Sequence, residues 1–225
     1  MKTAIFDLVH TLFNYDFDKA RDEFWEIVKV LDGVGNVSFE KFFEVYDKNF
    51  KIYQSTKEAN DLNFFKSIFD DLGIKFEVSD LEELSKKHLE IRKTFVKIDE
   101  SAEKVLTELR KRGYKLGLYS NGVREWSLHD FKITDFEHDK HFDKIVFSQE
   151  CGFLKPDIKA FALILYEMST YAKDAFFIGD NYDRDIAGAK NAGMHTIFLN
   201  NRRLKEFPDA DYEIKKLEEV LKILK

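Results

Sequence analysis

The sequence predicts an α/β fold in which a doubly wound parallel sheet is interrupted by an inserted bundle of helices. Three observations lead to this prediction. The chain begins with a short apolar strand, residues 3–7, that ends at Asp7. Strand and helix patterns alternate from about residue 98 to residue 199, which is typical of a parallel sheet with helices on both faces. Roughly a hundred residues separate the first strand from the next, although a crossover needs only about a dozen.

The inserted residues show four amphipathic stripes at helical spacing. They run over residues 20–31, 39–50, 62–72 and 81–95. Ser38 is the expected N-cap of the second helix, Gly73 ends the third, and Ser79 with Glu82 is a capping box before the fourth. Such helices can form a bundle of their own. We therefore expect residues 15–95 to form a helical cap and residues 1–14 and 96–225 to form the α/β core.

The elements after the insertion follow from apolar runs and helical stripes in turn. The sequence predicts helix 101–112, strands 115–119 and 144–148, helix 157–168, strand 175–178, helix 183–192, strand 195–199 and helix 215–224. This order completes a sheet that is covered on both faces.

Composition limits the classes of function. The chain has 225 residues, enough for one large domain or a domain with an insertion. The longest apolar run, residues 160–166, is far shorter than a membrane span, and the start shows no signal-peptide pattern. A net charge of −6 argues against nucleic acid as the main partner. The single cysteine, Cys151, excludes an internal disulfide and fits a reducing cytoplasm. The expected partner is a small molecule, and the sequence gives no oligomeric state.

Polar side chains follow four predicted strands. They are Asp7, then Ser120 with Asn121, then Lys155 before a helix, and then Gly179-Asp180 through Asp185. The carboxyl ends of parallel strands meet at one edge of a sheet, so these groups should converge. Carboxylates at Asp7 and Asp180 suit Mg²⁺, while Ser120, Asn121 and Lys155 suit phosphate oxygens. A cation there would polarise a phosphoryl group for attack by Asp7.

These four segments, in this order, resemble the haloacid dehalogenase superfamily of hydrolases. The resemblance covers about residues 1–13 and 96–200, and it implies a Rossmann-like core with the inserted helices as its cap. The last loop is especially close to the family pattern, since Gly179-Asp180 and Asp185 are followed by Ile186-Ala187-Gly188-Ala189 and Asn191-Ala192-Gly193.

The resemblance also implies roles for individual residues. Asp7 would be the nucleophile and a metal ligand, and Lys155 would steady both Asp7 and the transferring group. Ser120 and Asn121 would bind that group. Asp180 would bind Mg²⁺, with Asp185 as a further ligand or a partner of one.

Val9 is the departure from the family pattern. Family phosphatases have an Asp at this position, which protonates the leaving group and later activates water. The same position lends its backbone carbonyl to the metal, which a valine still provides. Acid–base assistance of this kind is worth about 10²–10⁴-fold in rate. The sequence therefore predicts a slow or narrow Mg²⁺-dependent phosphatase that acts on a small phosphorylated metabolite through an aspartyl-phosphate, best on acyl or aryl phosphates.

Three alternatives stay open. The family's dehalogenases also lack that Asp, carry an aromatic residue in its place and need no metal. Its phosphonatases carry Ala there and use a cap lysine as a Schiff base. A non-catalytic protein that binds a phosphorylated ligand would tolerate Val9 as well, although the complete set from Asp7 to Asp185 favours an enzyme.

Some polar residues receive structural interpretations. His10 could replace the missing acid–base group, but a structural role is the favoured interpretation for this residue. His88 is expected to pack inside the helical bundle. The segment from His129 to His141 matches no compact ligand motif, and we expect it to be a charged, exposed connection. Tyr15, Phe17 and Arg124 lie near the predicted loops and are candidate substrate contacts.

Overall fold

A parallel six-stranded sheet organises the protein, and the computed structural model describes residues 2–57, 60–201 and 209–225. The strand order is β5-β4-β1-β6-β7-β8, and every pair in it is parallel. The strands are β1 (Thr3–Phe6), β4 (Lys115–Ser120), β5 (Lys144–Phe147), β6 (Ala175–Gly179), β7 (His195–Leu199) and β8 (Tyr212–Ile214). The predicted α/β class is confirmed.

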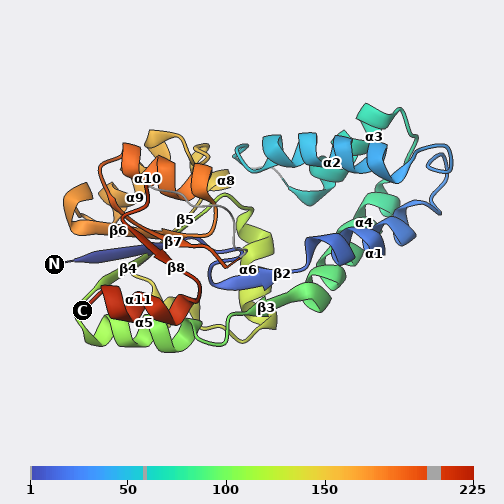
Figure 1. Ribbon diagram of the computed structural model, residues 1–225. Helices are drawn as coiled ribbons and strands as arrows, with labels where there is room; N and C mark the ends of the chain where they lie inside the picture. Colours follow the sequence, from blue (N-terminus) through green and yellow to red (C-terminus); the bar gives the residue numbers. More distant parts are fainter. Residues whose placement is uncertain (1, 58–59, 202–208) are drawn as a thin grey trace.

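Helices cover both faces of this sheet (Figure 1). One face carries α8 (Ser148–Cys151), α9 (Ile158–Glu167) and α10 (Gly188–Asn191), and the other carries α5 (Ala102–Lys111) and α11 (Val220–Ile223). Two further helices, α6 (Arg124–Ile133) and α7 (His138–His141), connect β4 to β5. Both sheet faces are thereby removed from water, which explains why the central strands are apolar throughout.

Strand β1 lies at the centre of the sheet, between β4 and β6. All four of its residues are buried. Its last residue, Phe6, is in register with Leu118 of β4 and Ile178 of β6. The next residue, Asp7, still donates its backbone N–H to the Ile178 carbonyl at 2.9 Å. The loops after these three strands therefore open at the same edge, as predicted.

The inserted segment forms four helices that lie together to one side of the sheet (Figure 1). They are α1 (Phe17–Val28), α2 (Phe39–Tyr53), α3 (Asp61–Leu72) and α4 (Val78–Phe95). Ser38 caps α2 by accepting the Lys41 N–H, and Gly73 ends α3 with a φ of 68°. The expected capping box at Ser79 is wrong. The N-cap of helix α4 is Glu77, two residues earlier, so the Asp80 carboxylate accepts the Glu77 N–H at 2.8 Å instead.

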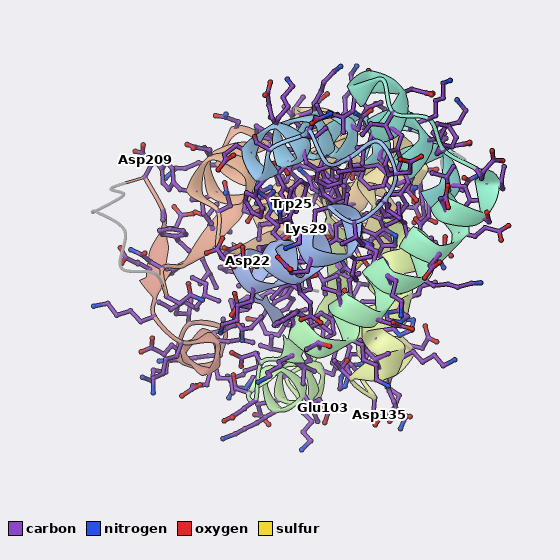
Figure 2. The ribbon with its side chains drawn as sticks, turned by 90° about the vertical axis from the view of Figure 1, so that its right-hand side faces the viewer. Asp22, Trp25, Lys29, Glu103, Asp135 and Asp209 are labelled. Atoms are coloured by element: carbon purple, nitrogen blue, oxygen red, sulfur yellow. The ribbon has the colours of Figure 1, made fainter. Side chains whose placement is uncertain are left out.

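Helix α1 shows how sequence spacing separates an inner and an outer face. Figure 2 shows Asp22, Trp25 and Lys29 on one side of it. Asp22 and Lys29 are exposed, whereas Trp25 is half-buried against Phe39 of α2. The residues that α1 buries lie on the opposite side, at positions 20, 24 and 28. The three- and four-residue steps of this pattern are those of a helix packed along one stripe.

Two short strands that the sequence pattern did not predict join the helices to the sheet. Strand β2 (Phe13–Tyr15) enters the helical segment and β3 (Val96–Ile98) leaves it. They pair antiparallel, with Phe13 opposite Ile98 and Tyr15 opposite Val96. The two connections between the sheet and the inserted helices are therefore hydrogen-bonded to each other.

The C-terminal prediction was wrong in detail. Residues 215–224 were expected to form one helix, but β8 precedes a 3₁₀ turn, η3 (Leu217–Glu219), and the single turn of α11. Ile214 pairs with Leu199 of β7, so the sheet gains a strand that was not predicted, directly before the expected helix. A short 3₁₀ turn, η1 (Ala172–Asp174), also precedes β6. Within the described ranges, no helix has the length and apolar character needed to cross a membrane.

Candidate active site at the carboxyl edge of the sheet

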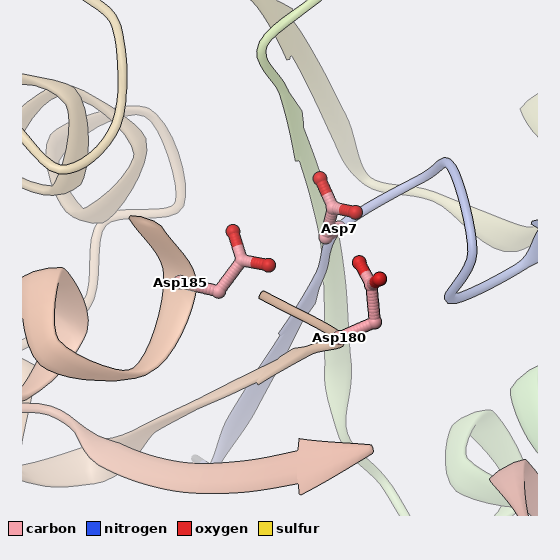
Figure 3. Close-up of side chains that lie close together, drawn as sticks. All are labelled: Asp7, Asp180 and Asp185. Carbon is pink, nitrogen blue, oxygen red and sulfur yellow. The ribbon is translucent and has the colours of Figure 1, made fainter. Parts of the chain in front are cut away.

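Three carboxylates meet where β1 and β6 end. Asp7 follows β1, Asp180 follows β6, and Asp185 lies on the helical turn beyond (Figure 3). Each offers one oxygen, and these oxygens all lie within 4.8 Å of one another. All three side chains are largely removed from solvent. The sequence named these residues because each follows an apolar strand.

The loop after β6 has the backbone needed for this approach. It forms a π-helical turn, η2 (Tyr182–Ala187), and the predicted helix 183–192 is therefore this turn followed by α10. The Asp185 carboxylate accepts the Asn181 N–H at 3.0 Å and so folds back over the strand end. A Cβ on Gly179 would lie 2.5 Å from an Asp185 oxygen. Only glycine leaves room there for the carboxylate.

Lys155 is the cation of this cluster. Its side chain is buried, and its Nζ lies 2.7 Å from Asp7 Oδ1 and 2.7 Å from Asp185 Oδ1. It also donates to the Tyr119 carbonyl at 3.1 Å. An ammonium has three N–H donors, so these contacts use all of them. Lys155 is held in one position rather than left to sample several.

The charges in this cluster do not balance. Burial alone would lower the pKa of Lys155, but the two adjacent carboxylates raise it above its ordinary value. Burial raises the pKa of Asp185, and the Asp7 charge raises it further, while Lys155 opposes both effects. Three carboxylates against one ammonium leave an excess of negative charge in a poorly solvated place.

Asn121 and Ser120 come from the loop after β4. The Asn121 side chain holds both backbone groups of Lys155, accepting its N–H at 2.8 Å and donating to its carbonyl at 2.9 Å. Asn121 therefore positions the lysine loop. Ser120 is buried and lines the same cavity as Asp7 and Lys155. The binding of phosphate oxygens by both residues stays a prediction.

The loop after Asp7 is compact. The Leu8 carbonyl accepts the N–H groups of Thr11, Leu12 and Phe13, which closes a tight turn. Val9 lies at the cavity with its apolar side chain, and His10 adopts a left-handed φ of 65°. The His10 ring packs edge-on against Phe17, with centroids 5.4 Å apart. This turn gives Asp7 an apolar neighbour in the cavity, two residues further along the chain.

A cavity of about 190 Å³ lies between this edge and the inserted helices. Arg92 of α4 and Asp130 of α6 also line it. The Arg92 guanidinium bonds both oxygens of the Asp130 carboxylate, with its Nε 3.1 Å from Oδ1. Both side chains are largely buried. Sequence reasoning missed this pair, because an Arg and an Asp on two amphipathic helices carry no local signal of pairing.

The segment from His129 to His141 was expected to be a charged, exposed connection, and this is only partly correct, because Asp135 and Asp139 are exposed but other polar residues are not. It belongs to α6 and α7, and both Asp130 and His141 are buried. His141 stacks on the Phe136 ring. The pairing with Arg92 compensates the charge that made the segment read as a surface connection.

Further polar contacts tie the inserted helices to the sheet. The Trp126 indole N–H of α6 donates to the Asp61 carboxylate of α3 at 2.7 Å. Gln54, just after α2, donates its side-chain amide to the Asn121 carbonyl and accepts the Ser148 hydroxyl on its own carbonyl. Residues next to the cavity are therefore held from both sides.

The remaining residues named from the sequence have different outcomes. Tyr15 and Phe17 line the cavity, and their contact with substrate stays a prediction. Arg124 pairs with Glu150 and does not line this cavity. His88 is buried among aromatic rings and bonds the Tyr46 hydroxyl at 3.1 Å, which confirms its predicted packing.

Comparison with known proteins gives one family. The family model of the haloacid dehalogenase-like hydrolases matches residues 4–199. The glyceraldehyde 3-phosphate phosphatase of Methanocaldococcus jannaschii is 26% identical over 236 residues, covering 100% of this chain and 97% of the relative. Similar phosphatases of other archaea match over only about half of their length.

Solved structures give the same fold. A phosphatase of this family from Thermococcus onnurineus superposes with a TM-score of 0.72 at 23% identity, covering 100% of this chain and 98% of the other. A 2-haloacid dehalogenase from Pseudomonas syringae superposes with a TM-score of 0.73 at the same identity and coverage. With the family model matching most of its length, this chain belongs to the haloacid dehalogenase-like hydrolases.

Proposed function

We propose that the protein is a Mg²⁺-dependent phosphatase that acts on a small phosphorylated metabolite through an aspartyl-phosphate on Asp7. The observation that carries this proposal is the cluster of Asp7, Asp180 and Asp185 around a single buried lysine. The full-length relative that is a glyceraldehyde 3-phosphate phosphatase supports the reaction class.

The residues fit a magnesium ion. Mg²⁺ takes one or two carboxylates together with water and phosphate oxygens. Asp7 and Asp180 supply carboxylate oxygens at suitable mutual distance, and Asp185 lies beside them. A divalent cation also offsets the excess negative charge that Lys155 leaves. When bound, Mg²⁺ polarises the phosphoryl group and neutralises charge on its oxygens.

Asp7 is the nucleophile in this proposal. Its carboxylate oxygen attacks phosphorus, the bond from phosphorus to the leaving oxygen breaks, and the electron pair leaves with that oxygen. Lys155 holds Asp7 in place through the 2.7 Å contact, and Asn121 holds Lys155. Water then attacks phosphorus, which restores the Asp7 carboxylate and releases inorganic phosphate. Ser120, at the same cavity, is the expected donor to the phosphoryl oxygens.

Val9 sets the scope of this reaction. It lies in the cavity beside Asp7 and offers no proton to the leaving oxygen. Leaving groups that depart as weak bases need no such proton, whereas alkoxides do. The protein should therefore favour acyl and aryl phosphates. We further propose that residues 15–95 act as a cap that closes the cavity over the substrate.

The test offers p-nitrophenyl phosphate, acetyl phosphate and 2-chloropropionate to the protein, each with Mg²⁺ and with chelator. Phosphate release that requires Mg²⁺ is expected, and Asp7→Asn should reduce it by about 10⁴-fold or more. Asp22→Asn is the matched control, because Asp22 is an exposed aspartate on α1 (Figure 2). Chloride release that persists in chelator would replace the proposal with dehalogenation. Binding of phosphate compounds without any turnover would replace it with a ligand-binding function.

A further inference from the structure

The cavity beside Asp7 brings several aromatic side chains close to the end where the phosphoryl group is proposed to bind. Its volume of about 190 Å³ exceeds the roughly 150 Å³ of an apolar protein cavity that accepts benzene. Asp7, Ser120 and Lys155 form one end of it. Six aromatic side chains line it elsewhere, together with apolar and polar residues, namely His10, Phe13, Tyr15, Phe17, Phe50 and Trp126.

These rings form two groups that come from different parts of the chain. In the first group, which follows the Asp7 loop, the Tyr15 and Phe17 rings meet edge-on with centroids 4.5 Å apart. In the second group, Phe50 of α2 stacks on Trp126 of α6, with centroids 5.5 Å apart and planes 8° from parallel. Rings fixed by such contacts present preformed surfaces for another ring.

Arg92 connects the two ring groups. Its guanidinium carbon lies 5.2 Å from the Tyr15 centroid and 5.3 Å from the Trp126 centroid. Because Arg92 is paired with Asp130, it brings no net charge to the cavity. Lys155 is likewise engaged by carboxylates, and the third basic residue described around the cavity, Arg184, is exposed. The buried part of the cavity favours one phosphoryl group and not a second anion.

Val9 adds a chemical condition at the same place. The leaving oxygen must depart without a proton from residue 9. A phenol has a pKa of about 10, whereas water has a pKa of about 15.7. An alkoxide is about as basic as hydroxide, so phenoxide is a much weaker base than an alkoxide and departs more readily without a proton. An aromatic ring bonded directly to the leaving oxygen would therefore contact the cavity rings and would also let that oxygen depart without a proton from residue 9.

We propose that the substrate is an aryl phosphate, with its aromatic ring against the rings that line the cavity and its phosphoryl group at Asp7. This inference rests on the proposed phosphatase function and names its substrate class. Asp7 forms a bond to phosphorus while the bond from phosphorus to the aryl oxygen breaks, and the aryl oxide leaves with the electron pair and takes a proton from water. A second water then releases phosphate, so that aryl phosphate and water give a phenol and phosphate.

Four substrates separate ring recognition from leaving-group basicity. Benzyl phosphate and ethyl phosphate both release an alkoxide but differ in the ring. Phenyl phosphate and benzyl phosphate both carry the ring but differ in the basicity of the leaving oxygen. With Mg²⁺, kcat/KM for benzyl phosphate should exceed that for ethyl phosphate about tenfold or more, as expected for burying one ring. Phenyl phosphate should in turn exceed benzyl phosphate. Glyceraldehyde 3-phosphate turned over faster than phenyl phosphate would overturn the proposal.

Binding gives a readout that does not require turnover. Phenylphosphonate and methylphosphonate cannot release an oxygen leaving group, and their dissociation constants for the Mg²⁺-loaded protein are measured by titration calorimetry. Phenylphosphonate should bind about 10- to 100-fold more tightly. Equal affinities would show that the rings do not recognise the ligand. Acetyl phosphate tests the catalytic function separately, because it carries no ring.

Variants locate the effect in the cavity. Phe17→Ala should lower the affinity ratio of phenylphosphonate to methylphosphonate several-fold, and it should fold because Phe17 is 44% exposed. Phe50→Leu keeps an apolar side chain but removes the ring that stacks on Trp126, and it should lower the ratio as well. Tyr166→Ala removes an aromatic ring that is 79% exposed on α9 and should leave the ratio unchanged. An unchanged ratio in both cavity variants contradicts the proposal.

Discussion

Two buried groups of charge face the same cavity, and they differ in balance. On the sheet side, Asp7, Asp180 and Asp185 surround one lysine. On the side of the helices, Arg92 and Asp130 pair one to one. A balanced pair satisfies its own charges and serves as a structural tie. An unbalanced cluster is costly to bury unless a ligand supplies the missing charge, which supports the proposal that the reaction takes place on the sheet side.

Adding a carboxylate to the unbalanced side should have the largest effect. Val9→Asp supplies the missing proton donor beside Asp7, so turnover of ethyl phosphate should rise by about 10²–10⁴-fold. Steady-state phosphate release measures the change. Val9→Asn has nearly the same size but no carboxylate, and it should give no such gain. Equal gains in both variants would mean that polarity, not proton transfer, limits the reaction.

Removing one partner of the balanced pair should cost stability. Asp130→Asn leaves the buried Arg92 guanidinium without its counterion, and the free energy of unfolding should fall by about 3–5 kcal/mol in urea titrations. Asp143→Asn is the matched control, because Asp143 pairs with Arg110 in a more exposed place and should cost about 1 kcal/mol or less. Similar losses in both variants would remove the distinction between the buried and exposed pairs.

Mg²⁺ should stabilise the protein through the unbalanced cluster. At a concentration of 100 times its dissociation constant, a ligand that binds only the folded state adds about 2.7 kcal/mol. Thermal unfolding with Mg²⁺ and with chelator measures this shift. Asp180→Asn should abolish it, whereas Asp130→Asn should keep it on a lower baseline. A shift that survives Asp180→Asn would place the ion elsewhere.

The helical side should respond to pH through His88. Burial among aromatic rings lowers the pKa of His88 well below its ordinary value, so the folded protein excludes a proton that the unfolded chain binds. Stability should therefore fall as the pH drops below about 6.5, and His88 contributes about 1.4 kcal/mol per pH unit to that slope. His88→Leu should reduce the slope measured by urea unfolding, whatever its effect at pH 7. His195→Gln, at an exposed histidine, is the control.

The sequence predicted the sheet side much better than the helical side. Asp7, Ser120, Lys155, Asp180 and Asp185 each follow or adjoin an apolar run, and parallel topology alone brings such positions to one edge. The convergence of these residues can therefore be predicted without any knowledge of side-chain contacts.

The helical side depends on contacts between distant residues. Arg92 and Asp130 lie on separate helices, and the pairing that buries Asp130 leaves no trace in its local segment. Strands β2 and β3 have three residues each, too few to show a period, and they form only because they pair with each other. The cavity rings likewise come together from β2, α1, α2 and α6. Such features need tertiary structure.

The position of β1 also bears on how the chain acquires its structure. This strand is the first to be synthesised, yet Thr3 pairs with Lys115 and Ala175. Its neighbours in the sheet therefore emerge only after the whole helical segment. Helices α1–α4 can form local contacts early, whereas the strand that carries Asp7 must wait for loop closures of more than a hundred residues. Asp7, the proposed nucleophile, is thus placed late in folding, and slow pairing of β1 should delay activity more than it delays helix formation.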